Sequence, residues 1–279
     1  MHTEFRALQS ASLGIARLTS LAHHLLAASA LVALLCEGAH ADSADNIGSA
    51  TAITTTVTGT VSATPAATLA TGDNVFQNET ITTDADGVGQ FQFNDQTKLA
   101  VGPGSTIVLN SFVYNAGGSQ PSKIVIGLTS GAMRFITGKA DHNSYEIDTP
   151  TATIGVRGTV FDVYTKPDGE MTVAMLDGAV EVCPKFGLCR LHNVVGKFLH
   201  MSPLGVFSLK DKWDGSFLQG VSFKLALPFM SDQDKLVPAL RGSAKTVTNY
   251  VKLAADDIGK ALKPPKLKLP KFTLPKLFK

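Results

Sequence analysis

The residue types that most often perform chemistry are sparse in this chain of 279 residues. Four of its seven histidines lie before Asp42, and the other three, His142, His192 and His200, are scattered. No serine stands in a nucleophile-elbow sequence, and Gly102-Pro103-Gly104 lacks the lysine and the following helix that a phosphate site needs. We therefore expect no catalytic residue, no cofactor and no enzyme activity.

Acidic side chains supply two weaker candidates for chemistry. One is a set of four aspartates that could bind calcium, Asp73, Asp84, Asp86 and Asp95. Their spacing does not match a calcium loop, so solvated turn residues are the simpler interpretation and we expect no metal site. The other is Asp148 with Asp162, a potential pair of catalytic carboxylates. We expect instead that such a carboxylate neutralises Arg157.

Cys183 and Cys189 are expected to form a disulfide, because an even number of cysteines in an exported chain favours one. The turn sequence between them, Pro184 to Leu188, would form a small closed loop, which contributes on the order of 2 kcal/mol. Metal binding is the weaker alternative, since His192 is the only nearby histidine and zinc needs four ligands. Cys36 follows Leu34 and Leu35 where a lipoprotein signal has small residues, so we assign it to a discarded leader.

The N-terminal segment, residues 1–41, is typical of a cleavable signal peptide. Arg6 and Arg17 precede an apolar run from Leu21 to Leu35, and Ala39-His40-Ala41 is a suitable cleavage sequence. The alternative, an uncleaved membrane anchor, is less favoured because the run is about 15 residues long and a span needs roughly 20. We expect a periplasmic or otherwise exported protein.

Charge is unevenly distributed along the chain. Residues 42–257 hold 16 basic and 21 acidic side chains, whereas residues 258–279 hold seven lysines and no acid. The tail, residues 263–279, repeats a pentapeptide of proline, lysine and mostly apolar residues, and its candidate contact residues are Lys266, Lys268, Lys271, Lys276 and Lys279. It could solubilise the chain, bind anionic lipid or lipopolysaccharide, or dock on a protein, and its apolar residues favour the last two. Nucleic acid is not an expected partner of an exported chain.

The elements that must position these residues are expected to be strands. Residues 42–71 are rich in alanine and threonine, which predicts a linker or a loosely held first strand. Residues 72–190 alternate short apolar runs with turn sequences and predict an all-β domain of antiparallel strands. Within it, Ser130-Gly131 and Asp177-Gly178 are expected to be turns, the second a hairpin.

The remaining residues are less regular. We expect residues 191–230 to add strands, one of them at Val221 to Leu227. Residues 231–262 show apolar side chains at three- and four-residue steps, interrupted near Arg241-Gly242-Ser243, and predict a helical segment that packs on the β domain.

One segment has the clearest structural signature. It is expected to form a strand, a glycine corner and a second strand, and its motif residues are Thr149, Pro150, Thr151, Ala152, Gly155, Val156, Arg157, Gly158 and Thr159. Arg157 stands between the two glycines, so its guanidinium is expected to fold back onto turn carbonyls or a buried acid. The alternative is that Arg157 projects outward and binds the carboxylate of a partner.

This segment resembles the core motif of the FecR domain, a periplasmic module of iron-transport regulators and stand-alone envelope proteins. The family's order of turns and strands is similar as well, from Gly72-Asp73 through Phe91 to Leu99 and on to Val173 to Val182. The resemblance implies an all-β fold, an antiparallel β-sandwich or solenoid-like domain, followed here by the helical segment and the basic tail.

Signalling members of that family also carry a cytoplasmic segment that holds a sigma factor. The stretch before the apolar run at Leu21 is too short for a folded cytoplasmic domain, so we expect a stand-alone form without that part. The expected function is binding of another envelope protein, as a sensor, scaffold or assembly factor. The alternative is a structural or surface-attached protein that the basic tail tethers to anionic lipid or polysaccharide.

Overall fold

The structure is a computed structural model that describes residues 45–61, 64–114, 122–214 and 217–255. The predictions on the leader, on Cys36 and on the tail lysines fall outside these residues. The strands are β1 (Asn46–Thr54), β2 (Val57–Val61), β3 (Ala67–Thr68), β4 (Asn74–Phe76), β5 (Glu79–Thr83), β6 (Val88–Phe93), β7 (Lys98–Val101), β8 (Thr106–Val113), β9 (Lys123–Ile136), β10 (Tyr145–Asp148), β11 (Ala152–Thr165), β12 (Met171–Pro184), β13 (Arg190–His192), β14 (Phe198–Met201) and β15 (Phe207–Lys210). The helices are η1 (His142–Ser144), α2 (Phe223–Ala226), α3 (Pro228–Ser231), η2 (Gln233–Lys235), η3 (Pro238–Leu240) and α4 (Ala244–Leu253).

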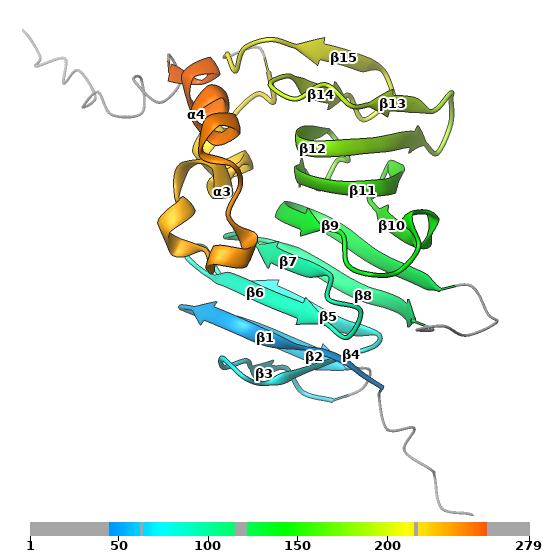
Figure 1. Cartoon of the computed structure of the whole chain (residues 1–279), viewed down its shortest axis with the longest axis vertical. Coiled ribbons are helices and arrows are strands. Elements are labelled where there is room, and N and C mark those ends of the chain that lie inside the picture. The colour runs from blue at the N-terminus through cyan, green and yellow to red at the C-terminus, as the bar shows by residue number, and fades with distance from the viewer. Residues whose placement is uncertain (1–44, 62–63, 115–121, 215–216, 256–279) are drawn as a thin grey trace, which may run out of the picture. The chain divides into compact units, whose positions relative to one another are not determined.

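These strands belong to one hydrogen-bonded sheet that forms two layers. The first layer runs β3–β2–β5–β8–β9–β10–β11–β12–β13, and the second runs β4–β1–β6–β7–β9–β11–β12–β14–β15. The long strands β9, β11 and β12 contribute one half of their length to each layer. Figure 1 shows the strands stacked as successive rungs from β3 to β15. The predicted all-β class is confirmed, and the strands form one mixed sheet.

The two layers pack against each other through one apolar core. β9 supplies Ile126 to this core from the first layer and Phe135 from the second, and β11 supplies Ile154 and Phe161 in the same way. All four side chains are buried. Because successive side chains of a strand point to opposite faces, alternate residues of every strand can enter this core.

Glycines let the long strands pass from one layer to the other. Gly131 in β9, Gly158 in β11 and Gly178 in β12 all have positive φ. The register of β11 against β12 shifts between Arg157 and Val160, as expected for a bulge built on a glycine. The predicted turns at Ser130-Gly131 and Asp177-Gly178 are therefore wrong. Both strands continue through the glycine and bend, since their two halves pair with neighbouring strands and not with each other.

Two further expectations need correction. The described residues of 42–71 form three strands, β1, β2 and β3, so the linker interpretation is wrong, and the alternative of a single loosely held strand underestimates the order of this part. Ile47, Ala50 and Val57 are buried there, which shows that small and β-branched residues suffice for this part of the core. The predicted ladder of residues 72–183 is antiparallel except that β10 pairs parallel to β9.

The described residues after β15, 211–214 and 217–255, cover the outer face of the second layer, and we call them the helical segment because they include α2, α3 and α4. Its buried side chains, among them Trp213, Phe223 and Tyr250, pack with Ala174 and Phe198 of the sheet. The strand expected at Val221 to Leu227 is instead the short helix α2, whose first turn is capped by the Ser222 hydroxyl at 3.2 Å from the Leu225 nitrogen. Helix α4 lies within the predicted helical residues and begins after the expected break, at Ala244.

Candidate functional site

The carboxylates considered for catalysis have structural partners. Asp148 accepts a hydrogen bond from the Thr153 hydroxyl at 2.9 Å. Asp162 is buried and forms a two-pronged ion pair with Arg134, with Nε–Oδ1 and Nη2–Oδ2 distances of 2.5 and 2.8 Å. The expected pairing of Asp162 with Arg157 is therefore wrong.

Arg134 fastens the helical segment to the sheet. Besides Asp162, its guanidinium contacts the Leu240 carbonyl oxygen at 3.2 Å and the Met230 sulfur at 3.6 Å, and it lies 5.7 Å from the centre of the Phe229 ring. Burial raises the pKa of the Asp162 carboxyl, and the neighbouring guanidinium offsets part of that effect. The groups that contact the ion pair come from the sheet and from the helical segment, so this cluster joins the two.

The threonines of the central motif also have structural roles. The Thr149 hydroxyl donates to the Ala152 carbonyl at 2.8 Å and accepts from the Ala152 N–H at 3.0 Å, which closes the turn before β11. The Thr151 hydroxyl donates to the Gly169 carbonyl at 2.7 Å and ties this turn to the one between β11 and β12. The Thr159 N–H donates to the Thr137 hydroxyl at 2.6 Å. Pro150 lies within the first of these turns, and Ala152 and Val156 are buried in the core.

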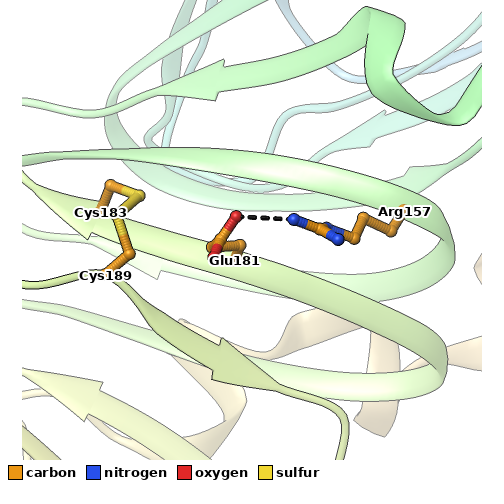
Figure 2. The surroundings of a disulfide bond; sticks show 4 residues. All are labelled: Arg157, Glu181, Cys183 and Cys189. Atoms are coloured by element: carbon orange, nitrogen blue, oxygen red, sulfur yellow. Dashed lines mark hydrogen bonds and ion pairs between the residues drawn. A yellow bond between two sulfur atoms is a disulfide. The ribbon is translucent and has the colours of Figure 1, made fainter.

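Arg157 does not fold back onto a buried acid. Its side chain is 55% exposed and pairs with Glu181 on β12, at an Nη2–Oε2 distance of 2.8 Å (Figure 2). Of the two glycines beside it, Gly158 has positive φ, whereas Gly155 sits in regular register opposite Glu181. The corner of the motif is therefore built at Gly158.

A disulfide closes the loop that follows β12. Cys183 and Cys189 are bonded, with their Cα atoms 4.0 Å apart, and Figure 2 shows the bond beyond Glu181 on the same strand. The closed loop is followed directly by β13, which pairs back onto β12. The predicted pairing of these two cysteines is confirmed.

This loop and the neighbouring turn expose four apolar side chains. Phe186 is 90% exposed, Leu188 is 89%, Leu204 is 88% and Val206 is 65%. The first two belong to the disulfide loop and the last two to the turn between β14 and β15. We call these four residues the disulfide-loop surface.

The two parts of the disulfide-loop surface touch. A Cβ placed on Gly205 would lie 3.0 Å from the Pro184 Cβ and 3.3 Å from the Phe186 carbonyl oxygen. The exposed side chain of Lys185 lies within the loop, and the exposed Arg190 follows it directly. The disulfide and the β12–β13 pairing both restrain the backbone of the loop that carries these apolar side chains.

The sequence indicates the loop but not its surface. The two cysteines predict a closed loop that contains phenylalanine and leucine, but whether these side chains are buried depends on the elements around the loop. The role of Arg134 has no comparable signal, because an arginine in a strand is expected to face solvent unless the element that covers it is known.

A groove lies elsewhere in the described residues. It has a volume of about 620 Å³ and runs between strand-connecting turns of the sheet and helices α2 and α3. Its buried lining includes Val88, Phe229 and Leu236, and the exposed Asp86 and Lys224 also line it. No three histidine, cysteine or acidic side chains of the described residues lie together as metal ligands. None of the described helices combines the length and apolarity that crossing a membrane requires.

Comparison with known proteins finds one family model that matches the central part of the fold. The model of a family described as "FecR protein" matches residues 79–181. Two crystal structures of a "putative anti-sigma factor" from Parabacteroides distasonis are each 16% identical to this chain and cover 47% of it, with TM-scores of 0.38 and 0.37. The match spans 58% of that protein's chain, which is less than two thirds of its length. No curated protein matches this chain.

Proposed function

We propose that the protein is an exported, non-catalytic regulatory module that binds another protein of the cell envelope, and the match of the FecR family model to residues 79–181 supports this. The disulfide-loop surface is the proposed contact site. Its partner would act with it in sensing, scaffolding or assembly.

The observation that carries this proposal is the exposure of four large apolar side chains on a restrained loop and the turn beside it. Contiguous exposed apolar groups on a soluble domain are typical of interaction sites. Aromatic and leucine side chains on a restrained loop lose little further conformational entropy on binding. The exposed basic side chains of Lys185 and Arg190 favour a partner with acidic side chains around an apolar centre. The disulfide supports an oxidising compartment, and hence the periplasm or another exported location.

Affinity capture from an envelope extract tests the proposal. The chain should retain a specific protein, and the double variant Phe186→Ser with Leu188→Ser should lose it. Val113→Ser is the matched control, since Val113 is another exposed apolar residue, on β8. Loss of the partner with the control as well, or retention with the double variant, would reject the surface.

The alternative function, attachment of the chain to anionic lipid or polysaccharide, depends on the basic tail. Its support is the run of seven lysines without an acid in residues 258–279. Co-sedimentation with anionic vesicles, comparing the whole chain with one that ends at Lys260, tests it. Equal pelleting of the two would remove this alternative.

A further inference from the structure

The second layer of the sheet ends at β15, and the outer edge of this strand is open. β15 pairs with β14, and no other described strand pairs with it. Leu209 on β15 is exposed, as are Leu204 and Val206 immediately before it. An exposed apolar strand edge of this kind offers unpaired backbone groups to any extended segment that reaches it.

The last described residues, at the end of α4, lie close to the end of β15. The Trp213 N–H donates to the Leu253 carbonyl at 3.1 Å, so the end of α4 is fixed close to the end of β15. Trp213 is buried among Phe198 of β14, Phe217 and Phe223, which makes this a firm anchor. The chain from Leu253 to Lys266 reaches about 40 Å when extended, whereas a strand of the length of β15 is about 13 Å long.

The tail has a sequence suited to such an edge. Three of its four prolines, Pro265, Pro270 and Pro275, leave runs of four residues between them, the length of β15. Each of the first two runs, Lys266–Leu269 and Lys271–Leu274, alternates a polar residue with leucine or phenylalanine. Proline is tolerated in an edge strand where its nitrogen faces solvent.

We infer that the C-terminal tail of this chain pairs with the open edge of β15 and covers Leu204, Val206 and Leu209. The tail thereby occupies part of the disulfide-loop surface, and a protein partner must displace it. This regulatory role rests on the proposed function, whereas the tail contact itself does not. Binding to the edge is peptide addition to a sheet, with backbone hydrogen bonds supplying affinity and the alternating apolar side chains supplying specificity.

Hydrogen exchange on the whole chain tests the contact. The test variant, called the serine variant, has serine in place of four apolar tail residues, Leu267, Leu269, Phe272 and Leu274. The backbone amides of residues 204–210 that do not pair with β14 should exchange at least about tenfold faster in this variant than in the natural chain. The control variant, with glutamine at Lys266, Lys268 and Lys271, keeps the apolar residues and should exchange like the natural chain.

Three outcomes would overturn the inference. Equal exchange in the natural chain and the serine variant means that the tail does not touch β15. If protection of the β15 amides from exchange rises with protein concentration, a second copy of the chain covers the edge. If this protection requires anionic vesicles and is lost in the glutamine variant, the tail binds lipid.

Capture of the envelope partner is scored separately from exchange. The serine variant should capture more partner than the natural chain, because its tail no longer competes for the surface. If neither protein captures any partner, the proposed function fails while the exchange result still decides the tail contact.

Discussion

Arg134 and Asp162 form a fully buried ion pair between neighbouring strands β9 and β11, and the same guanidinium reaches the carbonyl of Leu240 in the helical segment. One side chain therefore joins the sheet to the element that covers it. Removing one partner of such a pair leaves a buried charge without compensation, while removing both does not.

We expect Arg134→Met to lower the free energy of unfolding by about 3–5 kcal/mol, because Asp162 would remain buried and unpaired. The double variant Arg134→Met with Asp162→Leu should lose clearly less than the single one. Urea unfolding of both variants measures the difference. A double variant at least as unstable as Arg134→Met would show that the pair is not coupled as its geometry indicates.

The two motif glycines should respond differently to a methyl group. At Gly158, φ is +63° and a Cβ would lie 2.7 Å from the His142 ring, so Gly158→Ala should cost about 1–3 kcal/mol. At Gly155 the nearest atom to a Cβ is the Glu181 carbonyl oxygen at 3.8 Å, so Gly155→Ala should change stability by less than about 0.5 kcal/mol. Thermal melting of the two variants compares them directly, and equal losses would contradict the assignment of the corner to Gly158.

Arg157→Ala should have little effect on stability. The ion pair with Glu181 is solvent-exposed, and pairs of this kind contribute about 0.2–1 kcal/mol. A double-mutant cycle with Glu181→Ala measures the coupling. A fall of many degrees in melting temperature would show that Arg157 stabilises the fold. Loss of partner capture without a change in melting temperature would show that Arg157 belongs to the contact site.

Replacing both Cys183 and Cys189 by serine should lower the free energy of unfolding by about 2 kcal/mol, since the closed loop is short. Capture of the partner should fall by more than this stability loss explains, because Phe186 and Leu188 lose their fixed positions. Unfolding curves and capture are measured on the same preparation. Unchanged capture would show that the loop needs no restraint.

His192 predicts a specific pH dependence. Burial lowers its pKa to about 4, with a smaller contribution from Arg190, whereas the unfolded side chain titrates near 6.5. The unfolded state therefore takes up a proton first as the pH falls, and stability declines between pH 6.5 and 4 by about 3 kcal/mol. His192→Gln removes this contribution, so the natural chain should lose more stability than the variant across that range. Parallel stability curves for the two proteins would contradict the shift.

The kinds of elements follow from the sequence, but their connections do not. Alternation of apolar and polar side chains predicts the strands, and the cysteine count predicts the disulfide. Gly131 and Gly178 each follow a polar residue, a pattern that suits a hairpin and a bent strand equally well. Which of the two forms depends on the pairing of distant strands, and that information is not local.

The sequence predicts only part of the disulfide-loop surface. The cysteines predict the closed loop that contains Phe186 and Leu188, but the exposure of these side chains depends on the packing around the loop. Leu204 and Val206 lie further along the chain, and only the pairing of β14 with β12 and β15 brings them to the loop.

The structural role of Arg134 depends on which sheet face the helical segment covers. That face is not evident from the strand itself, since an arginine between apolar residues is compatible with either side of a sheet. The apolar residues Phe223, Leu227 and Met230 of the helical segment recur at three- and four-residue steps, as do those of residues 231–262, and this spacing indicates a covering element but not the face that it covers.

Site-specific photo-crosslinking in intact cells tests the central claim most directly. A photoreactive amino acid at position 186 or 204 should form a covalent adduct with one envelope protein, while the same group at position 113 should not. Absence of any protein adduct at 186 and 204, or an equal adduct at 113, would contradict the claim that the disulfide-loop surface is where this protein binds its partner.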